Sequence, residues 1–172
     1  MPDTMRRSAA VAAGALLTAL ITDQVTKSLI LDRIGPDTPR RSIAVVGELL
    51  QLTFVRNTGS AFGMFQGNSQ ILTFAALGAM IVLVAVFARN ARHDPWFALA
   101  IGLQLGGAFG NLADRLRHGY VVDFIDVPRF PTFNVADIAI TCGVTLMAYC
   151  LLFRDGSLTP PTPTPMNATE DV

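Results

Sequence analysis

The segment FNVADIAITCGVTLMAYCLLF, residues 133–153, contains a single charged side chain, Asp137, among its 21 residues. An α-helix needs about 20 predominantly apolar residues to cross the hydrocarbon core of a bilayer. Three further segments have the same character, at residues 9–31, 71–88 and 96–113. The sequence therefore predicts an all-α membrane protein with four transmembrane helices.

The distribution of charge supports this interpretation. The chain of 172 residues has 13 basic and 13 acidic side chains, and of these only Asp23, Lys27 and Asp137 fall within the four apolar segments. A soluble domain of this size could not bury four such helices. The formal net charge is zero, so no overall field would attract nucleic acid. We therefore expect no nucleic-acid partner.

The first apolar segment could instead be a cleaved secretory signal peptide, because it follows Arg6 and Arg7. The apolar run leads into TDQVTKSLIL without a convincing small-residue cleavage site. We therefore expect a retained helix. Four helices would place both termini on one side of the membrane, but the Lys and Arg residues near the helix ends do not select the side.

Residues 34–68 form the one sizeable connection between apolar segments. Within it, ELLQLTFVRN alternates apolar and polar side chains, which is typical of a β-strand. We expect a small β-sheet between the first and second helices, lying against the membrane face; a plain linker is the alternative. Residues 1–155 would form one membrane domain. The tail at 156–172, rich in Pro and Thr, is expected to be disordered.

The sequence lacks the motifs that are usual in metal-dependent, cysteine or serine enzymes. Its two histidines, His93 and His118, belong to no metal-binding motif. Cys142 and Cys150 lie about 12 Å apart along the last predicted helix, which is too far for a disulfide, so we expect packing roles. We therefore predict a site without metal or organic cofactor.

Carboxylates near the membrane remain as candidate functional groups, because each is costly there. Asp137 lies about one turn into the last apolar segment, and Asp123 lies in GYVVDFIDV, just after the third. The short connection between them would bring both to one membrane face. Two close carboxyl groups share a proton, so that one can activate water while the other protonates a leaving group. Spacing alone leaves Asp114 and Asp126 as competing candidates.

Two further patterns surround these carboxylates. Asn111 and Arg115 stand at positions i and i+4 at the end of the third segment, where they could hold substrate carbonyls or orient the carboxylates. Asp23 and Lys27 have the same spacing in the first segment, which favours a structural ion pair. Glycines at every fourth position of the third segment predict close helix packing: Gly102, Gly106 and Gly110.

Five blocks occur in order along the chain: TDQVTK, VRNTGSAFGMF, GGAFGNLADR, GYVVDFID and FNVADIAI. Together they resemble the ordered blocks of the lipoprotein signal peptidase family, the type II signal peptidases. The resemblance covers roughly residues 20 to 145 and leaves the N-terminus and the Pro-rich tail outside.

This resemblance implies a monomeric aspartic endopeptidase of the bacterial cytoplasmic membrane. It would act among membrane lipids on diacylglyceryl-modified prolipoproteins, cutting just before the lipidated cysteine and using no cofactor. Both termini would be cytoplasmic, and the sheet and active site would lie near the extracytoplasmic face. Matched by motif, Asp123 and Asp137 become the catalytic pair, and four residues become supporting or substrate-contacting: Asn57, Asn111, Arg115 and Asn134. Asp23 and Lys27 match a structural block.

Two alternatives come from other functional classes. A small transporter could use Asp23 and Asp137 as a proton or cation path, but it would need polar residues throughout the membrane depth, whereas the second segment is uncharged. A non-catalytic membrane scaffold would explain the repeated glycines. It would not explain two carboxylates at one membrane face.

Overall fold

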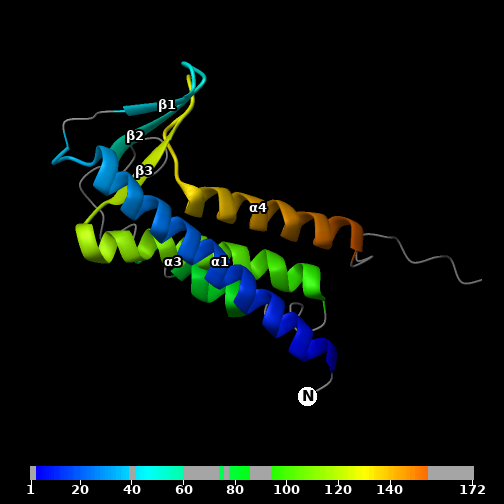
Figure 1. Ribbon diagram of the computed structural model, residues 1–172. Coiled ribbons are helices and arrows are strands. Elements are labelled where there is room, and N and C mark those ends of the chain that lie inside the picture. Colours follow the sequence, from blue (N-terminus) through cyan, green and yellow to red (C-terminus); the bar gives the residue numbers. More distant parts are fainter. Residues whose placement is uncertain (1–2, 39–41, 60–73, 76–77, 86–93, 155–172) are drawn as a thin grey trace, which may run out of the picture.

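The computed structural model describes residues 3–38, 42–59, 74–75, 78–85 and 94–154. In it, long helices lie side by side and a small sheet covers one end of them (Figure 1). The helices are α1 (Asp3–Ile34), α3 (Pro95–His118) and α4 (Val135–Tyr149), which continues into a π-helical turn at Cys150–Arg154. The strands are β1 (Ser42–Val46), β2 (Leu50–Asn57) and β3 (Val121–Asp126).

Three helices among the described residues are long and apolar enough to cross a membrane: α1, α3 and the helix Val135–Phe153. They confirm the first, third and fourth predicted apolar helices. The second, at 71–88, lies largely outside the described residues, although residues 78–85 are helical. The tail at 156–172 lies outside them entirely.

Helix α3 is longer than its apolar segment. It begins after Asp94, whose side chain accepts a hydrogen bond from the backbone N–H of Trp96, and it ends at Gly119, which adopts a left-handed conformation with φ 77°. This end is typical of a glycine C-cap. The last turns, beyond residue 113, therefore carry polar side chains toward the sheet.

The repeated glycines of α3 allow close helix contacts, as the spacing predicts. A Cβ atom at Gly102 would collide with the carbonyl oxygen of Ala12, and one at Gly106 with that of Leu16, both on α1. Gly107 approaches the backbone of α4 at Ala136 in the same way. Helix α3 is thus packed between α1 and α4.

The sheet has the order β1-β2-β3, with antiparallel neighbours. The predicted strand is confirmed as β2, but the expectation that the sheet lies between the first and second helices is incomplete. Its third strand comes from the connection between α3 and α4 and pairs with β2, placing Asp123 opposite Val55. The turn at Gly119 directs the chain from α3 into this strand.

Apolar contacts attach the sheet to the end of α1. Ile30 and Ile34 of α1 pack with Val122 and Phe124 of β3 in one buried cluster. The strand β3 is consequently buried along its first four residues, Asp123 among them.

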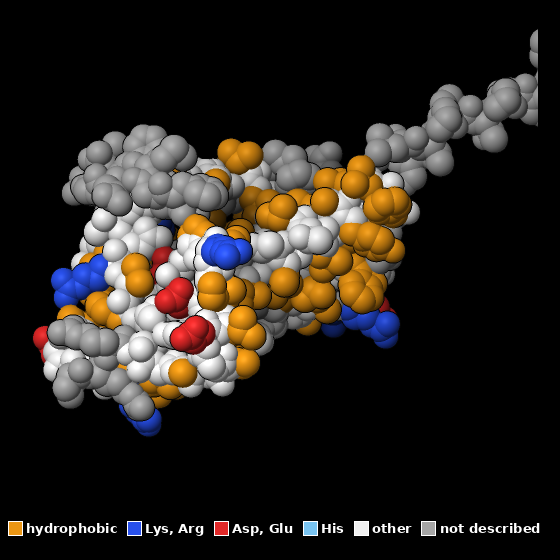
Figure 2. Space-filling model, turned by 90° about the horizontal axis from the view of Figure 1, so that it is seen from above, with side chains coloured by type: hydrophobic (Ala, Val, Ile, Leu, Met, Phe, Trp, Pro, Cys, Tyr) orange, Lys and Arg blue, Asp and Glu red, His pale blue; other side chains and the backbone are white. Residues whose placement is uncertain are grey.

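The surface separates apolar from charged regions. Hydrophobic side chains cover the helices on the face shown in Figure 2, while acidic side chains gather toward the end with the sheet. On one face of α1, four apolar side chains at every fourth position are each more than half exposed: Leu17, Ile21, Val25 and Leu29. Such a continuous exposed stripe is expected of a helix in contact with lipid.

The two cysteines differ in their surroundings. Both are free thiols, as their spacing predicts, and Cys150 is buried in a cluster with Phe97 and Met147. The expected packing role is wrong for Cys142, which is exposed on α4, because it lies on the helix face that turns away from α3.

Candidate active site

A cavity of about 530 Å³ lies where the sheet meets the beginning of α4. Its polar lining includes five of the six side chains predicted as catalytic or supporting: Asn57, Asn111, Arg115, Asp123 and Asp137. Its apolar lining includes residues of the β3–α4 connection and of the first turns of α4: Phe130, Pro131, Phe133, Ile138, Ile140 and Cys142.

Asp123 reaches this cavity from strand β3 and is 2% exposed. Its Oδ2 accepts a hydrogen bond of 2.7 Å from Asn57 Nδ2, and its Oδ1 accepts one of 2.6 Å from Asn134 Nδ2. The pKa of Asp123 is raised to about 6, chiefly by burial and in part by the negative charge of Asp137, while the two amide donors oppose the rise. The carboxyl group can therefore hold a proton near neutral pH.

Asp137 occupies the third position of α4 and belongs to a capping box. The backbone N–H of Asp137 donates to Asn134 Oδ1 at 3.0 Å, and the backbone N–H of Asn134 donates to Asp137 Oδ2 at 3.2 Å. Reciprocal bonds of this kind satisfy the free N–H groups at a helix start. Asn111 Nδ2 donates to the other oxygen, Asp137 Oδ1, at 2.9 Å.

Asn134 connects the two carboxylates. It is fully buried, and because its Oδ1 caps α4, its Nδ2 is left to donate to Asp123 Oδ1 and to Asn111 Oδ1, the latter at 3.1 Å. The structure thus brings Asp123 and Asp137 to one cavity, as the short connection between them predicts.

The competing carboxylates lie elsewhere. Asp114 is buried beneath β3, where its Oδ2 accepts the backbone N–H of Val122 at 3.0 Å and the ammonium group of Lys27 at 2.9 Å. Asp126 is on β3 opposite Gln51. Neither is among the residues that line the cavity.

The predicted ion pair between Asp23 and Lys27 is present, with Lys27 Nζ 2.8 Å from Asp23 Oδ2. The sequence pattern missed its other partners. Asp23 Oδ1 accepts the backbone N–H of Ala136 at 2.9 Å, and Lys27 Nζ also contacts Asp114 and Asn111. The pair therefore joins α1 to α3 and to the beginning of α4.

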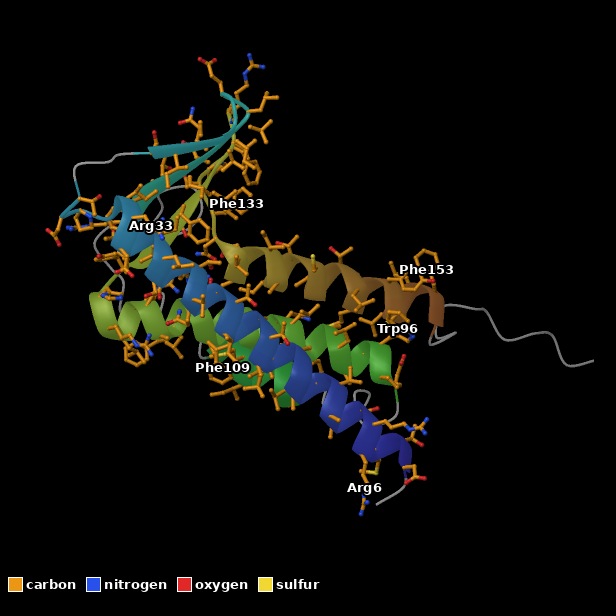
Figure 3. All side chains as sticks on the ribbon, in the orientation of Figure 1. Arg6, Arg33, Trp96, Phe109, Phe133 and Phe153 are labelled. Carbon is orange, nitrogen blue, oxygen red and sulfur yellow. The ribbon has the colours of Figure 1, made fainter. Side chains whose placement is uncertain are left out.

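Sequence reasoning also missed the apolar wall of the cavity. The aromatic residues of FPTF at 130–133 are a local signal for it, since Phe130 and Phe133 pack edge to face with ring centroids 5.6 Å apart. Figure 3 shows Phe133 beside the beginning of α4, below the sheet. A substrate in the cavity would contact this wall on one side and the polar groups on the other.

Two carboxyl groups at one cavity, one of them with a raised pKa, can share a proton and hold a water molecule between them. Asn57, Asn111 and Asn134 supply amide groups that fix the directions of the carboxyl oxygens. Among the described residues, no group of three or more His, Cys, Asp or Glu side chains could hold a metal ion. The arrangement suits general acid and base chemistry.

Comparisons with known proteins agree on one family. A family model described as Signal peptidase (SPase) II matches residues 15–153. The lipoprotein signal peptidase of Moorella thermoacetica is 39% identical over 140 residues, covering 81% of this chain and 91% of the relative. That of Rhodococcus jostii is 42% identical over 139 residues, covering 77% and 68%.

Solved structures give the same result. A bacterial membrane enzyme solved by the in meso method superposes with a TM-score of 0.75 at 33% identity, covering 89% of this chain and 93% of the other. A second such structure gives a TM-score of 0.72 at 34% identity, with 83% and 93% covered. The chain belongs to the signal peptidase II family and is a peptidase of the bacterial inner membrane.

Proposed function

We propose that this protein is an aspartic endopeptidase that removes the signal peptide from diacylglyceryl-modified prolipoproteins, cutting just before the lipidated cysteine. One observation carries the proposal: Asp123 and Asp137 line the same cavity and are bridged by the side chain of Asn134. The names of the relatives, lipoprotein signal peptidases, supply the substrate class.

The surroundings of the two carboxyl groups suggest their roles. Asp137 accepts hydrogen bonds from Asn111 and Asn134 at the beginning of α4, and these fix the directions of its two carboxyl oxygens. Asp123 has the raised pKa and keeps the shared proton. In this mechanism Asp137 takes a proton from water as the water oxygen attacks the scissile carbonyl. Asp123 then protonates the amide nitrogen as the carbon–nitrogen bond breaks.

The cavity walls suggest how the substrate lies. The acyl chains would remain in the bilayer beside the exposed apolar face of α4, and the apolar wall of Phe130, Phe133 and Ile138 would contact the substrate next to them. The peptide backbone would pass between the carboxyl pair and the sheet. Asn57 and Arg115, which line the cavity, would contact its carbonyl groups.

We further propose a monomer with one domain at residues 1–155 and a fourth transmembrane helix at 71–88. Arg6 and Arg33 lie at opposite ends of α1, and the sheet is at the end of Arg33 (Figure 3). With both termini cytoplasmic, this arrangement would place the sheet and the cavity near the extracytoplasmic face, where the modified cysteine of the substrate is presented.

Cleavage of a diacylglyceryl-modified prolipoprotein by purified protein in lipid vesicles tests the proposal. Asp123→Asn and Asp137→Asn keep the side-chain size but remove the acid, so both should abolish measurable cleavage. Asp114→Asn is the matched control, because Asp114 lies outside the cavity, and it should retain cleavage at an equal amount of folded protein. The proposed function would be rejected if the wild-type protein cut nothing, or if Asp123→Asn and Asp137→Asn cut normally.

A further inference from the structure

The ammonium group of Lys27 is almost fully buried, at 3% side-chain exposure. Within the described part of the chain, three acceptors surround it: Asp23 Oδ2 at 2.8 Å, Asp114 Oδ2 at 2.9 Å and Asn111 Oδ1 at 2.8 Å. A lysine has three N–H donors, so each acceptor can receive one. The third acceptor, Asn111, lines the cavity and does not belong to the ion pair.

The two carboxylates do not depend on Lys27 alone. Asp23 also accepts the backbone N–H of Ala136, and Asp114 also accepts that of Val122. The contact with Asn111 has a different consequence, because an amide group can take either of two orientations. Its oxygen faces two donors, the Lys27 ammonium and Asn134 Nδ2. The opposite orientation would place the NH₂ group against both donors and leave the oxygen facing Asp137.

We propose that Lys27 is a positioning residue of the peptidase reaction: its charge fixes the orientation of the Asn111 amide, so that Asn111 Nδ2 donates to Asp137 Oδ1. This inference rests on the proposed function and adds to the structural role of the ion pair. The path is short, since Lys27 Nζ contacts Asn111 at 2.8 Å and Asn111 contacts Asp137 at 2.9 Å. It lets a residue outside the cavity fix the direction of the Asp137 carboxyl group, which accepts the proton from water in the proposed mechanism.

Other charges also face Asp137. Asp123 lies opposite it on β3, and the Arg115 guanidinium on α3 interacts electrostatically with both carboxylates. Lys27 acts on Asp123 from α1, and its positive charge lowers the pKa of that carboxyl group. Removing Lys27 should therefore raise the pKa of Asp123 as well as release the direction of the Asn111 amide. The first effect appears in the pH profile of turnover and the second in kcat.

The experiment compares Asp114→Asn with the double variant Lys27→Met/Asp114→Asn. The two differ only in the ammonium group. Because Asp114 is already replaced by Asn in both variants, removing Lys27 leaves only one buried carboxylate, Asp23, without its cation. Turnover of a diacylglyceryl-modified prolipoprotein in vesicles is measured from pH 4 to 9 at matched amounts of folded protein. We expect kcat to fall roughly 10- to 100-fold in the double variant, with KM little changed. The alkaline limb should move to higher pH, because the charge of Lys27 lowers the pKa of Asp123.

Equal kcat values and equal pH profiles in the two variants would overturn the inference and leave Lys27 a structural residue. The proposed function would then still stand, because it is judged separately by Asp123→Asn and Asp137→Asn. If the double variant does not fold, Asn111→Asp provides the second test: it keeps an acceptor for Lys27 but cannot donate to Asp137 when ionised. A wild-type kcat in Asn111→Asp would also overturn the inference, because donation from Asn111 to Asp137 would then be dispensable.

Discussion

Asn134 Nδ2 lies 2.6 Å from Asp123 Oδ1, while the carbonyl oxygen of the same amide caps helix α4. One buried side chain therefore sets both the start of the helix that carries Asp137 and the direction of the carboxyl group on β3. Secondary structure and site geometry are coupled at this residue. A variant can separate the two roles. Capping requires only an acceptor, whereas the contact with Asp123 requires a side chain long enough to bring a donor to its carboxyl group.

We expect Asn134→Ser and Asn134→Ala to differ in stability but not in activity. Serine retains a capping oxygen but is too short to reach Asp123, whereas alanine loses both contacts. Loss of an N-cap costs about 0.5–2 kcal/mol, so Asn134→Ala should unfold at a lower temperature than Asn134→Ser. Both should lose most of their turnover. Thermal unfolding in detergent together with the cleavage assay measures the two effects, and an Asn134→Ser variant with wild-type turnover would show that the contact with Asp123 is dispensable.

The pH dependence of turnover should report the raised pKa of Asp123, about 6. Below that pH the free enzyme carries the proton that the leaving amine needs, and above it the proton is lost. We therefore expect kcat/KM to fall as pH rises above about 6, approaching a tenfold decrease per pH unit. A profile that stays flat from pH 5 to 8 would contradict a proton shared by the two carboxyl groups.

Asn57→Ala tests whether the alkaline limb of the pH profile belongs to Asp123. The hydrogen bond from Asn57 lowers the pKa of Asp123 by stabilising its ionised form. Its removal should raise that pKa and move the alkaline limb to higher pH, whatever the change in maximal rate. A limb that moves to lower pH, or does not move, would assign the limb to another group.

The sequence predicted those parts of the molecule that depend on local pattern. Apolar runs located α1, α3 and α4, alternation located β2, and the position of Asp137 in the first turn of its helix followed from where the apolar run begins. The spacing of Asp23 and Lys27 predicted their contact. Each of these features is set by residues within a few positions of one another.

The parts that were missed depend on contacts between distant segments. The pairing of β3 with β2 joins Asp123 to Val55 across 68 positions of sequence, and no local pattern encodes that register. For the same reason spacing could not choose between Asp114 and Asp123. The two differ in what covers them, since Asp114 turns toward Lys27 beneath the strand while Asp123 faces the cavity.

Helix packing predicts a contrast between two glycines. A Cβ at Gly106 would collide with the carbonyl oxygen of Leu16, a backbone atom that cannot move aside, whereas a Cβ at Gly14 would meet no atom within 4 Å. Gly106→Ala should therefore reduce the free energy of unfolding by about 1–3 kcal/mol. Gly14→Ala should leave it unchanged or raise it by up to about 1 kcal/mol, because alanine favours helix. Equal unfolding temperatures for the two variants in detergent would show that α1 and α3 do not approach as described.

The two cysteines allow the cavity to be located chemically. Cys142 is exposed on α4 and lines the cavity, whereas Cys150 is 1% exposed in the apolar cluster with Phe97. A membrane-permeable aromatic maleimide should therefore label Cys142 and spare Cys150, and the added group should block cleavage by occupying the space beside Ile138. Mass spectrometry identifies the labelled residue, and Cys142→Ser, which removes the thiol and keeps the side chain small, should cut normally and resist the reagent. Prior addition of the prolipoprotein to the inactive Asp123→Asn variant should slow labelling of Cys142, because substrate and reagent would compete for the cavity.

One outcome would contradict this location of the substrate. Full cleavage by protein labelled at Cys142 would place the substrate path elsewhere, since a bound aromatic group and a peptide cannot share this cavity.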